Sequence, residues 1–242
     1  MLKILFSPSE SKNSGGNEKQ KELLGSNNSR VEILQEYNNI IKNGNEDEIC
    51  KLFGFKKFTD CKEYVCDIFD SPLMCAIERY RGVAYDYLEF DTLTKNQQEY
   101  LKENTIIFSN LFGAILGGDT IPNYKVKQGN DIGEFIPDRF YNKKFSYQLD
   151  LYLANSDILD LRAGYYDKFY KPSKPYTTLK FLKNGKVVSH WAKAYRGIVL
   201  REIAKADINT IDEFMKLDIE GLIAQEIKII KNKTEIVYRI ED

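Results

Sequence analysis

The chain has 242 residues, 43% hydrophobic and 29% charged, which is typical of a globular protein rather than a disordered one. Its formal net charge of −1 excludes a uniformly basic surface, so binding to nucleic acid would require a local patch. No linker rich in Pro, Gly or Ser divides the chain, and no apolar run approaches the roughly 18 residues of a membrane-spanning helix. We therefore expect a single domain, residues 1–242, that is cytoplasmic and has no membrane partner.

Apolar runs and capping signals predict alternating strands and helices along the chain. The runs Leu2–Phe6, Thr105–Phe108 and Ile158–Leu161 are typical of buried strands. Helix starts are predicted where a capping residue precedes Glu or Gln by three positions, at Ser29 with Glu32, Thr94 with Gln97, and Thr210 with Glu213. Ser71-Pro72 predicts the start of a helix that reaches Tyr80. Residues 113–133 are rich in Gly, Pro and Asn, which predicts a long irregular segment, and residues 135–155 contain a helix.

Two hairpins are predicted in the second half of the chain. Asn184-Gly185 separates Thr177–Lys183 from Lys186–Trp191 and is the strongest short turn signal in the sequence. A closing hairpin joins Glu226–Ile230 to Glu235–Ile240. Buried strands that alternate with helices, together with these hairpins, predict a single α/β domain with a mixed central sheet and flanking helices.

The four cysteines and the single histidine are weak evidence for a metal site. The cysteines lie in the first third of the chain without Cys-x-x-Cys spacing, so we expect buried, reduced thiols. His190 stands alone, which excludes sites with two histidines, and we expect it to pack at a strand end. We predict no metal and no cofactor.

A helix predicted from Lys193 to Ala206 carries two cations on or beside its apolar face. Val199, Leu200 and Ile203 gather on one side at about 100° per residue, and Lys193 and Arg196 project toward the same side. Buried cations need anionic partners. The partner is either an internal carboxylate, such as Asp160 or Glu10, or an anionic ligand, for which phosphate is the obvious candidate.

Three loops that leave predicted strands carry the other candidate residues. In the first, the hydroxyls of Ser7, Ser9 and Ser11 with Lys12 are suited to an oxyanion, or the segment is an ordinary Ser-Pro turn. The second, residues 109–125, includes Tyr124 and Lys125. The third, residues 160–171, begins a series of lysines interleaved with aromatics, which suits phosphate contacts with base stacking or a solvated charged face.

Six segments, in the same order along the chain, resemble the YaaA family of peroxide-stress proteins. These are Ser7–Lys12, Tyr80–Tyr85, Phe108–Ala114, Ile121–Lys125, Asp160–Tyr166, and Ala192–Gly197 with Arg201. Two departures are Ser-Asn-Leu-Phe-Gly where the family usually has Ser-Gly-Leu-Tyr/Trp-Gly, and Tyr-Lys-Val where it has Tyr-Arg-Leu. Lys125 lacks the planar fork with which arginine binds an oxyanion at two points.

The resemblance implies a cytosolic protein that limits oxidative damage to DNA and proteins and lowers available iron during peroxide stress. It also implies a basic cleft that binds DNA, assisted by an element resembling a helix-hairpin-helix. The counterpart here, Ile49–Lys57, has one of the two glycines expected for close contact with a phosphate.

The leading hypothesis is a peroxide-stress protein that binds DNA, double-stranded or distorted. The predicted ligand-binding or DNA-binding residues are Ser7, Ser9, Lys12, Arg81, Lys125, Arg162, Lys168, Lys193, Arg196 and Arg201. The alternative is an enzyme that acts on a nucleotide or another phosphorylated small molecule in the same cleft. Its candidate catalytic residues are Glu10, Asp160, Ser9 and Tyr124.

Overall fold

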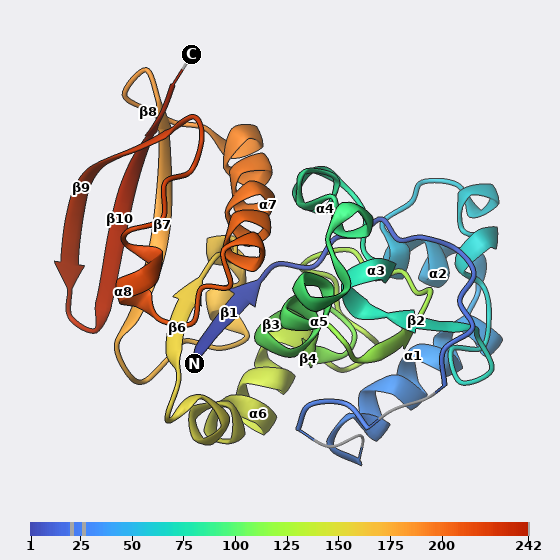
Figure 1. The fold of residues 1–242 in the computed structure, drawn as a ribbon. Helices are drawn as coiled ribbons and strands as arrows, with labels where there is room; N and C mark the ends of the chain where they lie inside the picture. Colours follow the sequence, from blue (N-terminus) through green and yellow to red (C-terminus); the bar gives the residue numbers. More distant parts are fainter. Residues whose placement is uncertain (20–21, 26–27, 242) are drawn as a thin grey trace.

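The structure is a computed structural model that describes residues 1–19, 22–25 and 28–241. In these residues the centre of the protein is an eight-stranded sheet with the order β4-β3-β1-β6-β7-β10-β9, and β8 pairs with β7 (Figure 1). Its strands are β1 (Leu2–Phe6), β3 (Thr105–Ser109), β4 (Gly113–Leu116), β6 (Asp157–Asp160), β7 (Tyr176–Lys183), β8 (Lys186–Val187), β9 (Leu222–Ile230) and β10 (Lys233–Ile240). A separate pair joins β2 (Leu73–Cys75) to β5 (Thr120–Pro122).

The middle of the large sheet is parallel and its edges are antiparallel. Strand β1 pairs in parallel with β3 and β6, and β7 pairs in parallel with β6 and β10. Strands β4, β8 and β9 run antiparallel to their neighbours. The predicted mixed-sheet α/β fold is therefore confirmed. Because parallel strands end at the same edge of a sheet, the loops that follow β1 and β6 lie close together.

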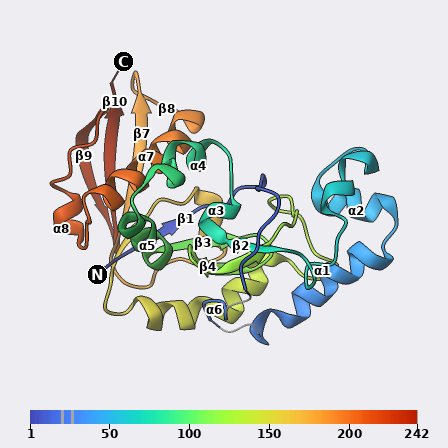
Figure 2. The same ribbon diagram turned by 45° about the vertical axis from the view of Figure 1, so that its right-hand side comes forward.

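Helices flank the sheet, and a lobe built around β2 and β5 lies beside it (Figures 1 and 2). The helices are α1 (Val31–Asn43), α2 (Glu46–Phe53), α3 (Ala76–Arg79), α4 (Val83–Leu88), α5 (Lys95–Asn104), α6 (Pro137–Leu153), α7 (Ser189–Lys205) and α8 (Ile211–Phe214). Short 3-10 turns are η1 (Asn28–Arg30), η2 (Phe58–Asp60), η3 (Lys62–Tyr64), η4 (Phe90–Thr92) and η5 (Gly164–Lys168). Helix α7 contacts β7 on one side and α4 and α5 on the other, so it connects the sheet to the helices that border the site.

Local signals located most of the regular elements. The predicted strand Leu2–Phe6 has the same bounds as β1, and both hairpins form. The capping boxes at Thr94 with Gln97 and at Thr210 with Glu213 are both present. A further capping box, Asn45 with Glu48, starts α2 and was not predicted. These features depend on contacts within a few residues, which sequence patterns report directly.

The helix predicted to start at Ser71-Pro72 is wrong. Leu73–Cys75 is instead a strand that pairs with β5, and only Ala76–Arg79 is helical. Both β5 and β4 lie in residues 113–133, which we expected to be irregular. Pairing between segments far apart in the chain outweighs the local preference of each segment.

The capping box expected at Ser29 with Glu32 is also wrong. Helix α1 starts after the 3-10 turn η1, and Arg30, without a side-chain cap, occupies the N-cap position. The Arg30 guanidinium is buried and donates to the carbonyls of Leu24, Phe112 and Ala114. The residue at the start of the helix is thus held by hydrogen bonds that its guanidinium donates to carbonyls outside the helix.

The helix expected from Lys193 begins four residues earlier, at Ser189. Strand β8 ends at Val187, so the hairpin arm predicted to reach Trp191 is short. His190 consequently lies in the first turn of α7, exposed, and not at a strand end.

Candidate functional site

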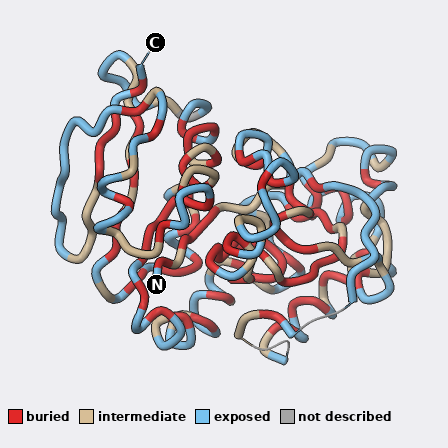
Figure 3. The backbone as a smooth tube through the Cα atoms, viewed as in Figure 1, coloured by how far each residue is buried: buried red, intermediate tan, exposed pale blue. Residues whose placement is uncertain are grey.

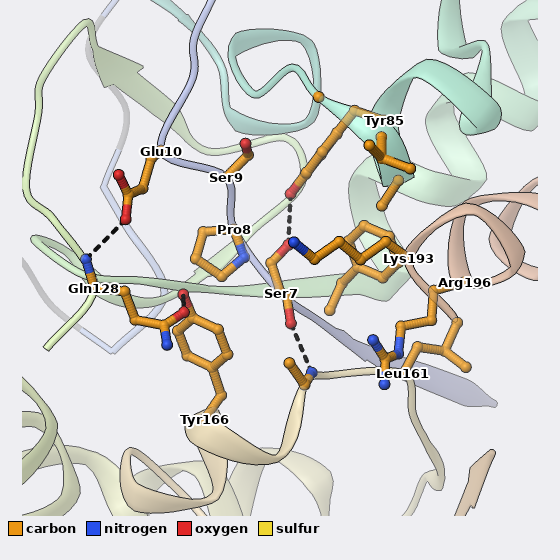
Figure 4. A pocket seen from close by; sticks show the side chains of 15 residues that line it. Ser7, Pro8, Ser9, Glu10, Tyr85, Gln128, Leu161, Tyr166, Lys193 and Arg196 are labelled. Carbon is orange, nitrogen blue, oxygen red and sulfur yellow. Dashed lines mark hydrogen bonds between the residues drawn. The ribbon is translucent and has the colours of Figure 1, made fainter. Parts of the chain in front are cut away.

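A pocket opens where the loops that follow β1 and β6 meet the first turn of α4 and one face of α7 (Figure 4). The cavity has a volume of about 330 Å³, within the range of small-molecule sites. The side chains that define it are Ser7, Pro8, Ser9, Glu10, Val83, Tyr85, Gln128, Tyr166, Lys193 and Arg196. It therefore combines apolar walls, hydroxyl groups and two cations.

Ser7 fixes the loop after β1 to both neighbouring elements. Its Oγ accepts a hydrogen bond from the backbone N–H of Ala163 at 2.8 Å, and its carbonyl accepts one from the Tyr85 hydroxyl at 2.9 Å (Figure 4). Since Oγ acts as an acceptor toward Ala163, its own hydrogen remains able to donate to a ligand. Ser9 also lines the cavity, and its Oγ accepts from the N–H of Ser11 at 3.3 Å.

Lys193 and Arg196 reach the pocket from α7. Three residues apart, they lie on the same side of the helix. Within the described chain, neither side chain makes a hydrogen bond or ion pair. Burial lowers the pKa of Arg196 from its ordinary value, and the Asp160 carboxylate acts in the opposite direction. Arginine remains charged at neutral pH, so the pocket wall carries positive charge that no bonded carboxylate neutralises.

The two carboxylates expected as partners of Arg196 bind other cations. Asp160 is buried, and its carboxylate accepts hydrogen bonds from Nε (2.8 Å) and Nη2 (2.7 Å) of Arg162. The Arg162 guanidinium also donates to the Tyr166 carbonyl and lies 4.3 Å from the centre of the Phe108 ring. Arg162 thus holds the loop after β6 in place, and its side chain is buried beneath the pocket wall instead of lining it.

Glu10 lines the pocket and is tied to the loop on the far side. Its carboxylate is 3.2 Å from Lys125 Nζ and accepts from the Gln128 N–H at 3.1 Å. Lys125 is buried and lies 5.1 Å from the centre of the Phe55 ring. The structure therefore places Lys125 behind Glu10, away from the pocket lining.

Lys12 and Tyr124 are buried beside one another, outside the pocket lining. Lys12 Nζ donates to the carbonyls of Ser9 and Glu10 and lies 3.9 Å from the centre of the Tyr124 ring. Burial, and then the charge of Lys125, hold the pKa of Lys12 well below its ordinary value. Burial also raises the pKa of Tyr124, whose hydroxyl bonds to Ser109 and Tyr80 at 2.6 and 2.7 Å. Of the four candidate catalytic residues, only Ser9 and Glu10 face the cavity.

The remaining predicted cations lie elsewhere. Arg201 donates to the carbonyls of Leu88 and Glu89 and pairs with the Glu89 carboxylate at 3.2 Å, which caps the C-terminal end of α4. Arg81 is exposed and lines a separate cavity with several carboxylates. Lys168 is exposed, with Nζ 5.0 Å from the centre of the Tyr165 ring.

Residues 2–227 match the family profile described as peroxide stress protein YaaA. The chain belongs to the YaaA family. It is 47% identical to the uncharacterized protein Cj0984 of Campylobacter jejuni, with 100% of both chains covered. A UPF0246 protein of Corynebacterium glutamicum is 32% identical over 74% of this chain and 76% of its own. A UPF0246 protein of Clostridioides difficile is 30% identical over 67% and 69%.

In this YaaA family member, the aromatic residues of the lysine-rich series belong to the core. Tyr166, Phe169 and Tyr170 are buried, and Lys174 Nζ donates to carbonyls at the C-terminal end of α6. The expected stacking surface for bases is therefore absent from these aromatics as the structure describes them.

The Ile49–Lys57 segment differs from a helix-hairpin-helix in two ways. Gly54 adopts the left-handed conformation after α2, but its N–H and that of Phe55 both bond to the Cys50 carbonyl. Those amides are used to cap the helix and do not face outward to a phosphate. The 3-10 turns η2 and η3 follow where a second helix would be expected.

Sequence reasoning missed five of the ten side chains that define the pocket, namely Pro8, Val83, Tyr85, Gln128 and Tyr166. Tyr85 lies in the first turn of α4. Gly82, which precedes this helix, has φ 117°, and a Cβ at this position would lie 3.1 Å from Ser9 Oγ. The Arg81-Gly82 turn was the available signal for both. Gln128 lies in a Gly-rich and Asn-rich loop without a distinguishing pattern.

In the part of the chain that the structure describes, none of the four cysteines forms a disulfide; three are buried and Cys66 is half-buried. Across residues 1–19, 22–25 and 28–241, no group of three His, Cys, Asp or Glu side chains could hold a metal ion. None of the helices in these ranges is long and apolar enough to cross a membrane.

Proposed function

We propose that this protein acts in the peroxide-stress response by binding a phosphate group in the pocket between the β1 loop and α7. The observation that carries the proposal is the pair Lys193 and Arg196, which line one cavity and, among the described residues, bond to no carboxylate. A guanidinium can donate two parallel hydrogen bonds to one phosphate, and an ammonium adds a point charge. The Ser7 hydroxyl, on the β1 loop that lines the same cavity, supplies a further donor.

A phosphorylated small molecule of nucleotide size fits this pocket better than a DNA duplex. The cavity of about 330 Å³ has apolar wall residues, Pro8 and Val83, beside the cations, which suits a ligand with both an anionic and an apolar part. Duplex binding depends on several phosphates neutralised together. Lys12, Lys125 and Arg201, which would have extended the patch, bind carbonyls, Glu10 or Glu89 instead.

DNA remains a second candidate because Lys193 is exposed while Arg196 is partly buried. A cation at the surface of the pocket suits the backbone of a distorted strand whose displaced nucleotide enters the cavity. In this form the protein would limit oxidative and iron-mediated damage to DNA, as the resemblance to the YaaA family implies.

Calorimetric titration with AMP, ATP and inorganic phosphate tests the small-molecule proposal. We expect saturable nucleotide binding that weakens only modestly between about 50 and 200 mM salt, because an enclosed ion pair is screened little. Arg196→Ala should weaken binding at least tenfold with little change in melting temperature, since Arg196 has no ion-pair partner to lose among the described residues. Arg196→Lys should restore it in part.

The matched control is Arg81→Ala, which removes an exposed arginine from a different cavity and should leave nucleotide affinity unchanged. Wild-type affinity in Arg196→Ala would contradict the assignment of the pocket. Fluorescence anisotropy with duplex and bulged oligonucleotides tests DNA in parallel. The slope of log affinity against log salt is about −0.9 for each phosphate that the protein neutralises. If nucleotides do not bind, and this slope for DNA corresponds to three or more phosphates, the DNA proposal replaces the small-molecule one.

A further inference from the structure

Strand β9 forms a long, exposed edge of the large sheet, and its sequence alternates isoleucines with Glu226 and Lys228 (Figures 1 and 3). Among the described residues it pairs with β10 alone, and Ile227 and Ile229 are 51% and 78% exposed. Gln225 is left out of the pairing by a β-bulge, so Glu226–Ile230 is the regular part of the free edge. An apolar edge of this kind pairs readily with another strand, and proteins usually cover it or interrupt it with charges.

We propose that a second copy of this chain covers the edge, with β9 pairing antiparallel to the partner's β9 about a two-fold axis. Two-fold contacts use the same surface on both copies, and antiparallel pairing of identical strands satisfies this condition. The two eight-stranded sheets would then form one continuous sheet, with the unpaired N–H and C=O groups of both edges satisfied.

The charges on β9 select the register. In a symmetric antiparallel pair, one residue lies opposite its own copy, and the residues on either side of it lie opposite one another. Centring on Glu226 or on Lys228 would place like charges together, which is unfavourable. Centring on Ile227 places Glu226 opposite the partner's Lys228, and Lys228 opposite the partner's Glu226. Glu226 and Lys228 already lie on one face, with their charged atoms 3.0 Å apart, so both ion pairs form on the same side of the sheet.

Engineered disulfides test both the contact and its register. Ile227→Cys should oxidise to a covalent dimer, because paired Cα atoms at the axis are about 4.5–5.5 Å apart, within disulfide range. The matched variant Ile229→Cys should not, because the two copies of position 229 would be displaced by four residues, roughly 13 Å. A non-reducing gel of the wild-type protein measures any cross-linking by its four native cysteines and serves as the background. Equal cross-linking at both positions, or none at position 227, would overturn the register.

Sedimentation equilibrium between about 1 and 100 μM tests the association without a new cysteine. We expect a dimer that Glu226→Lys weakens at least tenfold, because the introduced lysine would face the partner's Lys228. The exchange Glu226→Lys with Lys228→Glu should restore the wild-type constant within about threefold. The control Tyr147→Ser, at an exposed position on α6, should have no effect. A wild-type protein that stays monomeric throughout this range, or an exchange that fails to restore a dimer that the single change weakened, would refute the proposal.

Discussion

Replacing Gly197 by alanine should destabilise the protein and distort the pocket, although alanine is the better helix former. Gly197 lies inside α7, where the exchange alone would stabilise the fold by about 0.5–1 kcal/mol. However, its Cβ would lie 2.0 Å from the carbonyl oxygen and 2.9 Å from the carbonyl carbon of Ala84 in α4. These are backbone atoms, so α4 would have to move away by roughly 1 Å or more to reach ordinary contact.

Overpacking of this kind costs about 1–3 kcal/mol or more and outweighs the gain in helix propensity. We expect a net loss of about 1–2 kcal/mol, equivalent to a melting temperature lower by about 2–8 °C for a chain of this length. Because Ala84 and Tyr85 line the pocket, ligand affinity should fall as well. Differential scanning calorimetry measures the first effect, and nucleotide titration measures the second.

Gly164→Ala is the matched control. No heavy atom lies within 4 Å of the Cβ position at Gly164, and its backbone is not left-handed, so its melting temperature should stay within about 2 °C of wild type. If Gly197→Ala were as stable as wild type, or more so, the close approach of α4 and α7 would not be a property of the protein, and the reasoning would fail.

Three further predictions concern buried polar groups. Arg162→Ala should cost about 3–5 kcal/mol in urea unfolding, because it leaves the buried Asp160 carboxylate without its bidentate partner; a loss below about 1 kcal/mol would contradict this. Lys12→Met should stabilise the protein at pH 7. The pKa of Lys12 is lowered in the folded state, so at pH values between this lowered pKa and 10.5 the unfolded state binds one more proton than the folded state. The stability advantage of the methionine variant should therefore shrink as the pH rises toward 10.5. An advantage independent of pH would show that Lys12 keeps its ordinary pKa. Burial raises the pKa of Cys61 to about 12, so native alkylation, followed by mass spectrometry, should modify the half-buried Cys66 before Cys61; the reverse order would contradict the burial.

Elements whose causes are local could be predicted from sequence patterns. The apolar run Leu2–Phe6, the capping pair Thr94 with Gln97 and the turn Asn184-Gly185 each depend on residues within one short segment. The order of strands and helices then implied a mixed-sheet α/β fold. Loops at the carboxyl ends of parallel strands were expected to converge, and the resemblance to the YaaA family placed Ser7 and the α7 cations in one cleft.

Which charges meet depends on how distant segments pack together, and the sequence did not reveal this. Asp160 and Glu10 were equally plausible partners for Arg196, yet they bind Arg162 and Lys125. Glu10 and Lys125 are 115 residues apart in the chain, so sequence spacing carries no information on the few ångströms between their charges in the fold. Asp160 and Arg162 are two residues apart, but whether their side chains turn toward one another depends on the packing around the loop after β6. The same reason separates Lys12 from Arg196. Both are cations that the sequence analysis placed in the site, but packing buries Lys12 over the Tyr124 ring and leaves Arg196 facing the cavity.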